Sequence, residues 1–167
     1  MTIHSLSQAL RLTKSPRVAL VGGGGKTTAL FQLARELDER VLLSATTHLA
    51  VEQTLLADRH VVINDPEDVS TIDFLNLSGT LLLTGPNNGK GRTRGLDAAC
   101  INAVYKAAEE YRLPLIIEAD GARSLPFKAP REHEPPIPDF CDLVIVIAGL
   151  SVLGKPMTED YVYNPGG

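Results

Sequence analysis

The sequence contains no tryptophan, and aromatic residues make up only 5% of its 167 positions. It also has no run close to the roughly 18 consecutive apolar residues that a membrane-spanning helix needs. Residues 1–16, MTIHSLSQALRLTKSP, lack the uninterrupted apolar centre of a signal peptide. Apolar residues nevertheless make up 44% of the chain. We therefore expect a cytoplasmic globular protein with an aliphatic core and no membrane partner.

Basic charge and paired cysteines are scarce as well. The 16 Lys and Arg residues are outnumbered by 20 Asp and Glu residues, giving a net charge of −4. A nucleic-acid partner normally requires a concentrated excess of basic residues, so none is expected. Cys100 and Cys141 form no metal-binding spacing, and we expect both thiols to be reduced and buried. The length favours a single domain over residues 1–167.

Short apolar runs alternate with segments of helical periodicity along the chain. The predicted strands are residues 17–21, 41–44, 60–64, 80–84, 115–117 and 143–147. The predicted helices are residues 27–40, 49–57 and 96–111. The strands at 115–117 and 143–147 are apolar without alternation, which is typical of strands covered by helices on both faces. This order predicts an α/β fold with a mostly parallel sheet.

Four consecutive glycines separate the first predicted strand from its helix, in VALVGGGGKTT. The dinucleotide pattern GxGxxG fails, because Thr27 or Thr28 takes the place of its last glycine. The common phosphate loop GxxxxGK[ST] fails at one end, where Leu20 replaces the first glycine. A shorter pattern, GxxGKTT, is fully matched by Gly22, Gly25, Lys26, Thr27 and Thr28.

This shorter loop retains the chemistry of a nucleotide site. The backbone N–H groups of Gly22, Gly23, Gly24 and Gly25 can converge on phosphate oxygens at the N-terminus of the next helix. Lys26 supplies positive charge for the β- and γ-phosphates, and the Thr27 hydroxyl can ligate Mg²⁺. A flexible turn with a solvated lysine is the structural alternative, but it gives no reason for Gly-Lys-Thr-Thr after an apolar strand. We therefore predict a three-layer, P-loop NTPase-like fold that binds ATP and Mg²⁺.

Two carboxylates follow the predicted strand at 115–117. Glu118 and Asp120 are two residues apart, so their side chains can point to one side of the carboxyl edge of the sheet. Ligands bind at this edge in open α/β sheets. One carboxylate is predicted to hold Mg²⁺ or its water, and the other to orient a nucleophile. The alternative is a turn in which Asp120 caps a local N–H before Gly121.

Thr46 and Thr47 follow the second predicted strand. Their hydroxyls either reach the metal or the γ-phosphate, or they cap a helix before Leu49. His48, beside them, is interpreted as structural or exposed rather than catalytic.

Two further loops carry candidate residues. GPNNGKGRTRG, residues 85–95, gathers Lys90, Arg92 and Arg94, which we interpret as a solvated basic turn in preference to an anion-binding flap. Prolines after Leu125 exclude a helix or a central strand and predict a long ordered loop. Within it, Arg123 and Lys128 are candidates for stabilising phosphoryl charge or binding substrate. Glu132, His133 and Glu134 are weaker candidates for metal ligands, since no second histidine or paired cysteine is near.

The segments VGGGGKTT, SATTH, EADGAR with EHEPPIP downstream, and VIAGLSVLGKP together resemble the YqeC family over residues 17–161. This resemblance implies an accessory role in the maturation of selenium-dependent molybdenum hydroxylases, which would be partners of the chain. The glycine loop is also similar to that of Mur-type ligases, GTNGKTT, whose metal is held by a glutamate after a later strand. That likeness assigns nucleotide and Mg²⁺ roles to Gly22, Gly25, Lys26, Thr27, Thr28 and Glu118 without establishing ligase chemistry.

The chain departs from the family in two places. It ends at YVYNPGG where relatives continue, so a C-terminal segment is expected to be missing. Tyr163 and Asn164 stand where the resemblance leads us to expect a His-Arg pair.

The resulting hypothesis is ATP hydrolysis or phosphoryl transfer in hydroxylase maturation. Its proposed catalytic residues are Lys26, Glu118, Asp120, Arg123 and Lys128. One alternative is a nucleotide-switched module that docks an apo-hydroxylase or a cofactor carrier with little turnover. Another is a ligase or kinase that acts on a small anion.

Overall fold

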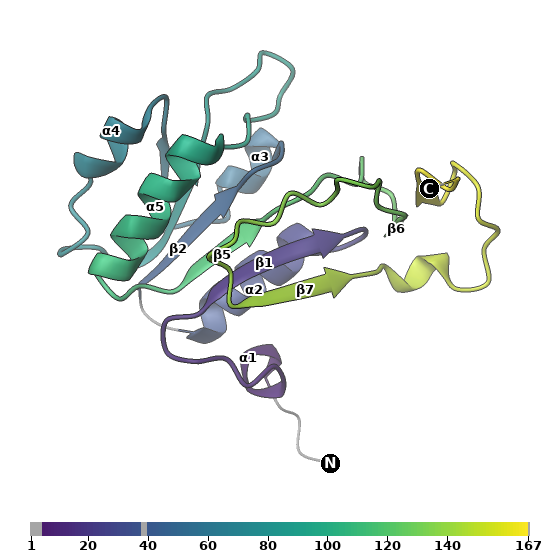
Figure 1. The fold of residues 1–167 in the computed structure, drawn as a ribbon, viewed down its shortest axis with the longest axis horizontal. Coiled ribbons are helices and arrows are strands. Elements are labelled where there is room, and N and C mark those ends of the chain that lie inside the picture. The colour runs from purple at the N-terminus through teal and green to yellow at the C-terminus, as the bar shows by residue number, and fades with distance from the viewer. Residues whose placement is uncertain (1–4, 38–39, 167) are drawn as a thin grey trace.

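A computed structural model describes residues 5–37 and 40–166 of the chain. Its centre is a six-stranded sheet in the order β3-β4-β2-β5-β1-β7, in which all neighbouring strands are parallel (Figure 1). The strands are β1 (Arg17–Gly22), β2 (Arg40–Ala45), β3 (Arg59–Val62), β4 (Gly79–Thr84), β5 (Leu115–Glu118) and β7 (Leu143–Ile147). The parallel sheet predicted from the sequence is thus confirmed.

Helices cover both faces of this sheet and make the fold a three-layer, P-loop-like α/β architecture, as predicted. The helices are α1 (Leu6–Ala9), α2 (Lys26–Leu37), α3 (Val51–Thr54), α4 (Pro66–Ser70) and α5 (Ala98–Glu110), with a 3₁₀ turn at Leu150–Val152. Figure 1 shows α4 and α5 on one face and α2 on the other.

All three predicted helices differ from the observed ones in their bounds, and the one predicted over 96–111 is α5. The helix predicted over 27–40 is α2, which begins one residue earlier and is described as far as Leu37; positions 38 and 39 lie outside the described residues. The helix predicted over 49–57 is the single turn α3. Helices α1 and α4 were not predicted.

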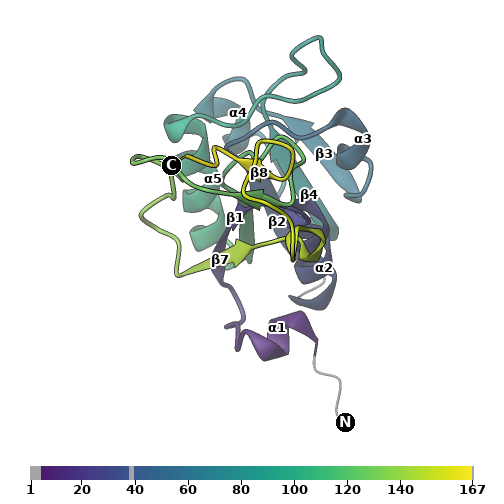
Figure 2. The ribbon, with the colours of Figure 1, turned by 90° about the vertical axis from the view of Figure 1, so that its right-hand side faces the viewer.

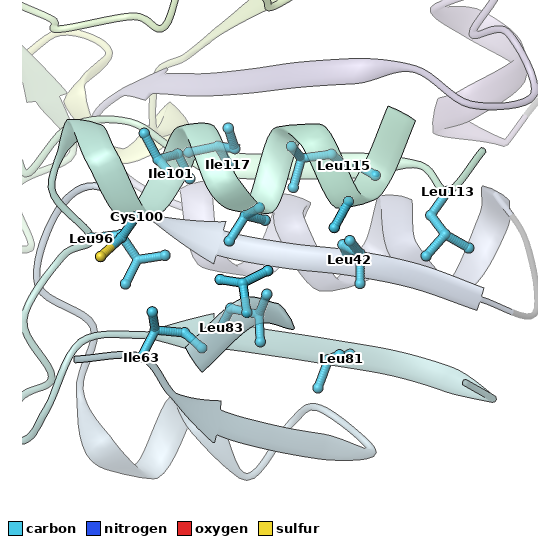
Figure 3. Packing of buried hydrophobic residues seen from close by; sticks show 14 of the residues in the cluster. Leu42, Ile63, Leu81, Leu83, Leu96, Cys100, Ile101, Leu113, Leu115 and Ile117 are labelled. Carbon is cyan, nitrogen blue, oxygen red and sulfur yellow. The ribbon is translucent and has the colours of Figure 1, made fainter. Parts of the chain in front are cut away.

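The core is aliphatic, as the composition indicates, and lies on both faces of the sheet. On the α5 face, Ile101 and Val104 of the helix pack over strand residues such as Leu42. Figure 3 shows this cluster, to which β4 and β5 also contribute leucines and an isoleucine. The start of α5 is fixed by Asp97, whose side chain accepts a hydrogen bond of 2.8 Å from the N–H of Cys100.

Strand β7 corrects one expectation. Its apolar sequence predicts helices on both faces, but Val144 and Val146 are 39% and 74% exposed. The reason is its position at the edge of the sheet, where it pairs with β1. In the described part of the chain, the side bearing these valines is open to solvent.

The proline-rich segment is extended, as predicted, and contributes a short strand, β6 (Phe127–Lys128). It pairs in parallel with β8 (Val162–Tyr163) in a separate two-stranded sheet. Figure 2 looks at the carboxyl ends of the large sheet and shows β8 lying across them. No helix among residues 5–37 and 40–166 is long and apolar enough to cross a membrane.

Candidate functional site

The glycine loop begins where β1 ends and opens directly into α2. Gly22 has φ +96°, and a Cβ there would fall on the carbonyl oxygen of Ile147. A Cβ at Gly23 would come within 2.8 Å of backbone atoms of Leu125 and Phe127. The N–H of Gly23 donates to Ile147 O at 2.8 Å. The first two glycines are therefore required by close packing against two other segments.

Lys26 lies inside this loop. Its side chain is only 6% exposed, and its Nζ donates to Gly22 O at 2.6 Å. The same ammonium is 3.4 Å from Oδ1 of Asp120. The positive charge is thus held at the N-terminus of α2, where the helix dipole also attracts anions.

Thr27 and Glu118 meet beside Lys26. The Thr27 hydroxyl donates to Oε2 of Glu118 at 2.8 Å. Burial raises the pKa of the Glu118 carboxyl above its ordinary value, although the Thr27 hydrogen bond and the charge of Lys26 act in the opposite direction. A hydroxyl and a carboxylate in contact are the oxygen donors that Mg²⁺ uses together with substrate phosphates.

Asp120 links the loop to the proline-rich segment. Its Oδ2 accepts a hydrogen bond of 3.1 Å from the N–H of Gly22 and lies 3.3 Å from Nζ of Lys128. Lys128 is in turn 3.1 Å from Oε2 of Glu134, and this contact lowers the pKa of the Glu134 carboxyl. The side chains of Lys26, Asp120, Lys128 and Glu134 form a row of alternating charges, which we call the charge row.

A cavity of about 290 Å³ lies over the glycine loop; we call it the loop cavity. It is lined by Gly24 to Thr28, by Glu118 and by two arginines from distant loops, Arg92 and Arg123. Arg92 reaches it because its Nη2 donates to the carbonyl oxygen of His48 at 2.6 Å. Of the residues predicted from the sequence, the structure brings Gly24 to Thr28, Glu118 and Arg123 together at this cavity, whereas Gly22 and Gly23 do not line it.

Arg123 has an unusual backbone. Its φ is +50° and that of Ser124 is +64°, a left-handed conformation that is rare for residues with a Cβ. The Arg123 guanidinium lies 5.3 Å from the ring centre of Tyr163, and Lys128 Nζ lies at the same distance. Tyr163 therefore packs against both cations of the segment.

Thr46, Thr47 and Lys128 line a different, narrower cavity of about 160 Å³, together with Asp120 and Glu134. The Thr46 hydroxyl donates to Ala119 O at 3.1 Å. The alternative that these threonines cap the following helix was wrong, since the N-cap of α3 is Ala50. His48 is exposed, as expected, and lines the loop cavity.

Sequence reasoning missed Tyr163, and it favoured a solvated turn for Arg92 over the flap that would place this arginine at the site. Arg92 depends on an antiparallel bridge to Ala50, and Tyr163 on the pairing of β6 with β8; no local spacing in the sequence signals either contact. Lys90 and Arg94 of the same basic loop are exposed and do not line the loop cavity.

The weaker metal candidates are not gathered into a site. Within the described residues, no group of three or more His, Cys, Asp or Glu side chains can hold a metal ion. Glu134 is instead paired with Lys128, and its neighbours Glu132 and His133 are exposed.

The fold and the glycine loop define an α/β protein with a P-loop-like architecture. The chain belongs to the YqeC family, whose model, described as "YqeC protein", matches residues 18–166. It is 31% identical over 152 residues to the Escherichia coli (strain K12) protein named "Uncharacterized protein YqeC". This similarity covers 88% of the present chain and 57% of that relative, so the chain spans little more than half of the relative's length. No solved structure matches the chain.

Proposed function

We propose that the protein binds ATP with Mg²⁺ in the loop cavity and hydrolyses it or transfers its γ-phosphoryl group. The observation that carries this proposal is the contact between the Thr27 hydroxyl and Glu118 beside the buried Lys26. These three groups supply, at the start of one helix, two oxygen donors for a hard cation and one charge for a phosphate.

The cavity is chemically suited to a triphosphate. Lys26, Arg92 and Arg123 contribute three cations to its lining, against the single carboxylate of Glu118. At Gly25, which has φ +110°, nothing among the described residues lies within 4 Å of the place a Cβ would take. Backbone N–H groups can therefore approach a bound anion here without obstruction.

Each residue has a distinct role in the proposal. Lys26 exchanges its contact with Gly22 O for a phosphate oxygen, and Thr27 with Glu118 holds the metal. Asp120 fixes Gly22 and Lys26 and orients the attacking group, while Lys128 positions Asp120. Arg123 and Arg92 stabilise charge that develops on the phosphoryl oxygens. When bound, Mg²⁺-ATP supplies the phosphoryl group and the metal charge.

The pathway assignment rests on family membership. The YqeC resemblance supports placing this chemistry in the maturation of selenium-dependent molybdenum hydroxylases, with the apo-hydroxylase as a partner. A specific observation also favours the second candidate, a nucleotide-switched docking module: Leu150, Leu153 and Met157, which follow β7, are exposed. Phosphate release by the purified protein, with and without an apo-hydroxylase, separates sustained turnover from binding without turnover.

Calorimetric titration with Mg²⁺-ATP tests the nucleotide site. We expect Lys26→Met to weaken binding at least about 100-fold, since it removes a charged contact to phosphate. Lys90→Met is the matched control, because Lys90 is exposed and also follows a glycine. This variant should bind Mg²⁺-ATP with the affinity of the wild type. Circular dichroism checks the fold of each variant.

Thr27→Val provides a second test: it should remove the Mg²⁺ dependence of binding. Unchanged affinity in a folded Lys26→Met protein would overturn the proposal.

A further inference from the structure

An apolar cavity of about 590 Å³ lies on the α5 side of the fold; we call it the α5 cavity. One wall is the N-terminal half of α5, including Ala98, Ile101 and Tyr105, and the other is the proline-rich segment from Pro136 to Phe140. Its volume is typical of small-molecule sites, which measure about 300–1,000 Å³.

Four of the lining residues carry rings, beside aliphatic side chains and the polar Asn102 and Asp139. The rings of Tyr105 and Phe140 stack with their centres 4.3 Å apart and their planes 5° apart. Pro136 and Pro138 add two further rings to the wall. Tyr105 and Phe140 cover each other on one face, so a ligand can contact only their outer faces and the proline rings. Such faces favour a flat apolar ligand over a branched one, because the contact area is larger.

The α5 cavity adjoins the charge row. Thr46 and Pro136 line both it and the narrower cavity that holds Asp120, Lys128 and Glu134. That narrower cavity shares Gly121 with the loop cavity. The three cavities are therefore neighbours, with Thr46, Pro136 and Gly121 as their shared lining residues.

The junction has a defined hydrogen-bonding preference. The one hydroxyl proton of Thr46 is used in the bond of 3.1 Å to Ala119 O, which leaves its oxygen able only to accept. A ligand group at this point must therefore donate. In the neighbouring smaller cavity, Oδ1 of Asp120 is buried and has no hydrogen-bond partner among the described residues, but it is paired with the Lys26 ammonium at 3.4 Å.

We propose that the α5 cavity binds a small molecule with a flat apolar ring that carries a hydroxyl or amino group. The ring lies between α5 and residues 136–140, and the hydroxyl or amino group donates to Thr46. The same molecule would be the second ligand of the nucleotide site. This assignment rests on the proposed function above. The ring site itself depends only on the walls and on Thr46.

Two matched probes test the site. 5-Hydroxyindole and indole share one flat ring system and differ by one hydroxyl. In ¹H–¹⁵N NMR titrations we expect both to shift signals of α5 and of residues 137–140, with 5-hydroxyindole bound about fivefold tighter, the effect of one hydrogen bond. Thr46→Val should remove that difference and leave indole binding unchanged.

Two alanines in the first turn of α5 provide the structural control. Ala98 lines the cavity and Ala99 does not, and both are exposed. Ala98→Trp should fill the cavity and weaken both probes at least about tenfold, whereas Ala99→Trp should bind them like the wild type. The proposal is overturned if neither probe binds the wild type, if Ala98→Trp binds them equally well, or if the two probes bind with equal affinity.

A separate titration of the wild type with Mg²⁺-ATP keeps the two proposals apart. If the wild type binds the probes but not Mg²⁺-ATP, the proposed function is overturned and the α5 cavity remains a ligand site. If the wild type binds Mg²⁺-ATP but neither probe, the α5 ligand site is overturned and the proposed function stands.

Discussion

Residues 22–28 and residues 85–95 are similar in composition and different in structure. Both loops are rich in glycine, both place a lysine directly after a glycine, and both precede a long helix. In the first, Lys26 is buried and in contact with Asp120; in the second, Lys90 is exposed.

The glycines of the two loops serve different purposes. Gly23 is required because the backbone of Leu125 and Phe127 lies against it. Gly89 has φ +76° and, among the described residues, no atom within 4 Å of the place of a Cβ, so it serves only to turn the chain. The helix ends differ as well, because Asp97 already accepts the hydrogen bond of an N–H at the start of α5. A glycine-rich basic segment therefore becomes a candidate phosphate site only where other segments pack around it.

The largest expected effect comes from exchanging one glycine in each loop for alanine. Gly23→Ala should lower the free energy of unfolding by about 3 kcal/mol, because the Cβ forces the surrounding backbone apart, and should remove Mg²⁺-ATP binding. Gly89→Ala should cost about 1 kcal/mol, the strain of a left-handed φ, and leave binding intact. Urea unfolding followed by circular dichroism measures the stability of both variants, and calorimetry measures their Mg²⁺-ATP binding. Equal losses in the two variants would contradict the distinction.

Glu118→Gln should change stability and metal use in opposite directions. Because burial raises the pKa of Glu118 in the folded protein, its contribution to stability is fully present below the pKa of the unfolded chain and is lost as pH rises through the folded pKa. The variant keeps an oxygen for Thr27 but does not titrate. We expect its Tm to exceed that of the wild type by a margin that grows from pH 4 to pH 8, as measured by thermal denaturation.

The same variant should bind Mg²⁺-ATP at least about tenfold more weakly, since the proposed metal site would lose one ligand. Calorimetry with and without Mg²⁺ measures this loss. A variant that is more stable but binds Mg²⁺-ATP with unchanged affinity would exclude Glu118 as a ligand.

The smallest expected effect lies in the basic loop. Arg92→Ala should weaken Mg²⁺-ATP binding about fivefold, a modest loss because Arg92 is exposed and water screens its charge. Arg94→Ala, two residues away and not part of the loop cavity, should have no effect. The comparison is made by calorimetry at low and at physiological salt, and the Arg92 effect should shrink as salt increases. Equal effects of the two substitutions would indicate a general charge contribution.

The sequence was sufficient where the determinants are local or follow from strand direction. The GxxGKTT spacing and the carboxylates at the end of β5 predicted that Lys26, Thr27 and Glu118 lie together, because parallel strands end at the same edge. The contact of Thr27 with Glu118 agrees with that expectation.

The order of the strands in the sheet could not be predicted in the same way. β5 and β7 are both short apolar runs, yet β5 is central and fully buried while β7 is an edge strand with two exposed valines. Apolar composition reports a preference for burial, whereas the neighbours of a strand are determined by the whole topology. The position of Arg92 was hidden for a related reason, because it depends on a bridge between residues 50 and 92.

The charge row connects the glycine loop electrostatically with residues 128–134. If Lys26 turns toward a phosphate, Asp120 retains Lys128 as its ammonium partner, and Lys128 also balances Glu134. Because Lys26, Asp120 and Lys128 are buried, solvent screens such a change weakly. Binding of a phosphate in the glycine loop would then alter the free energy that holds residues 128–134 in place, so that the charge row would couple the two segments electrostatically.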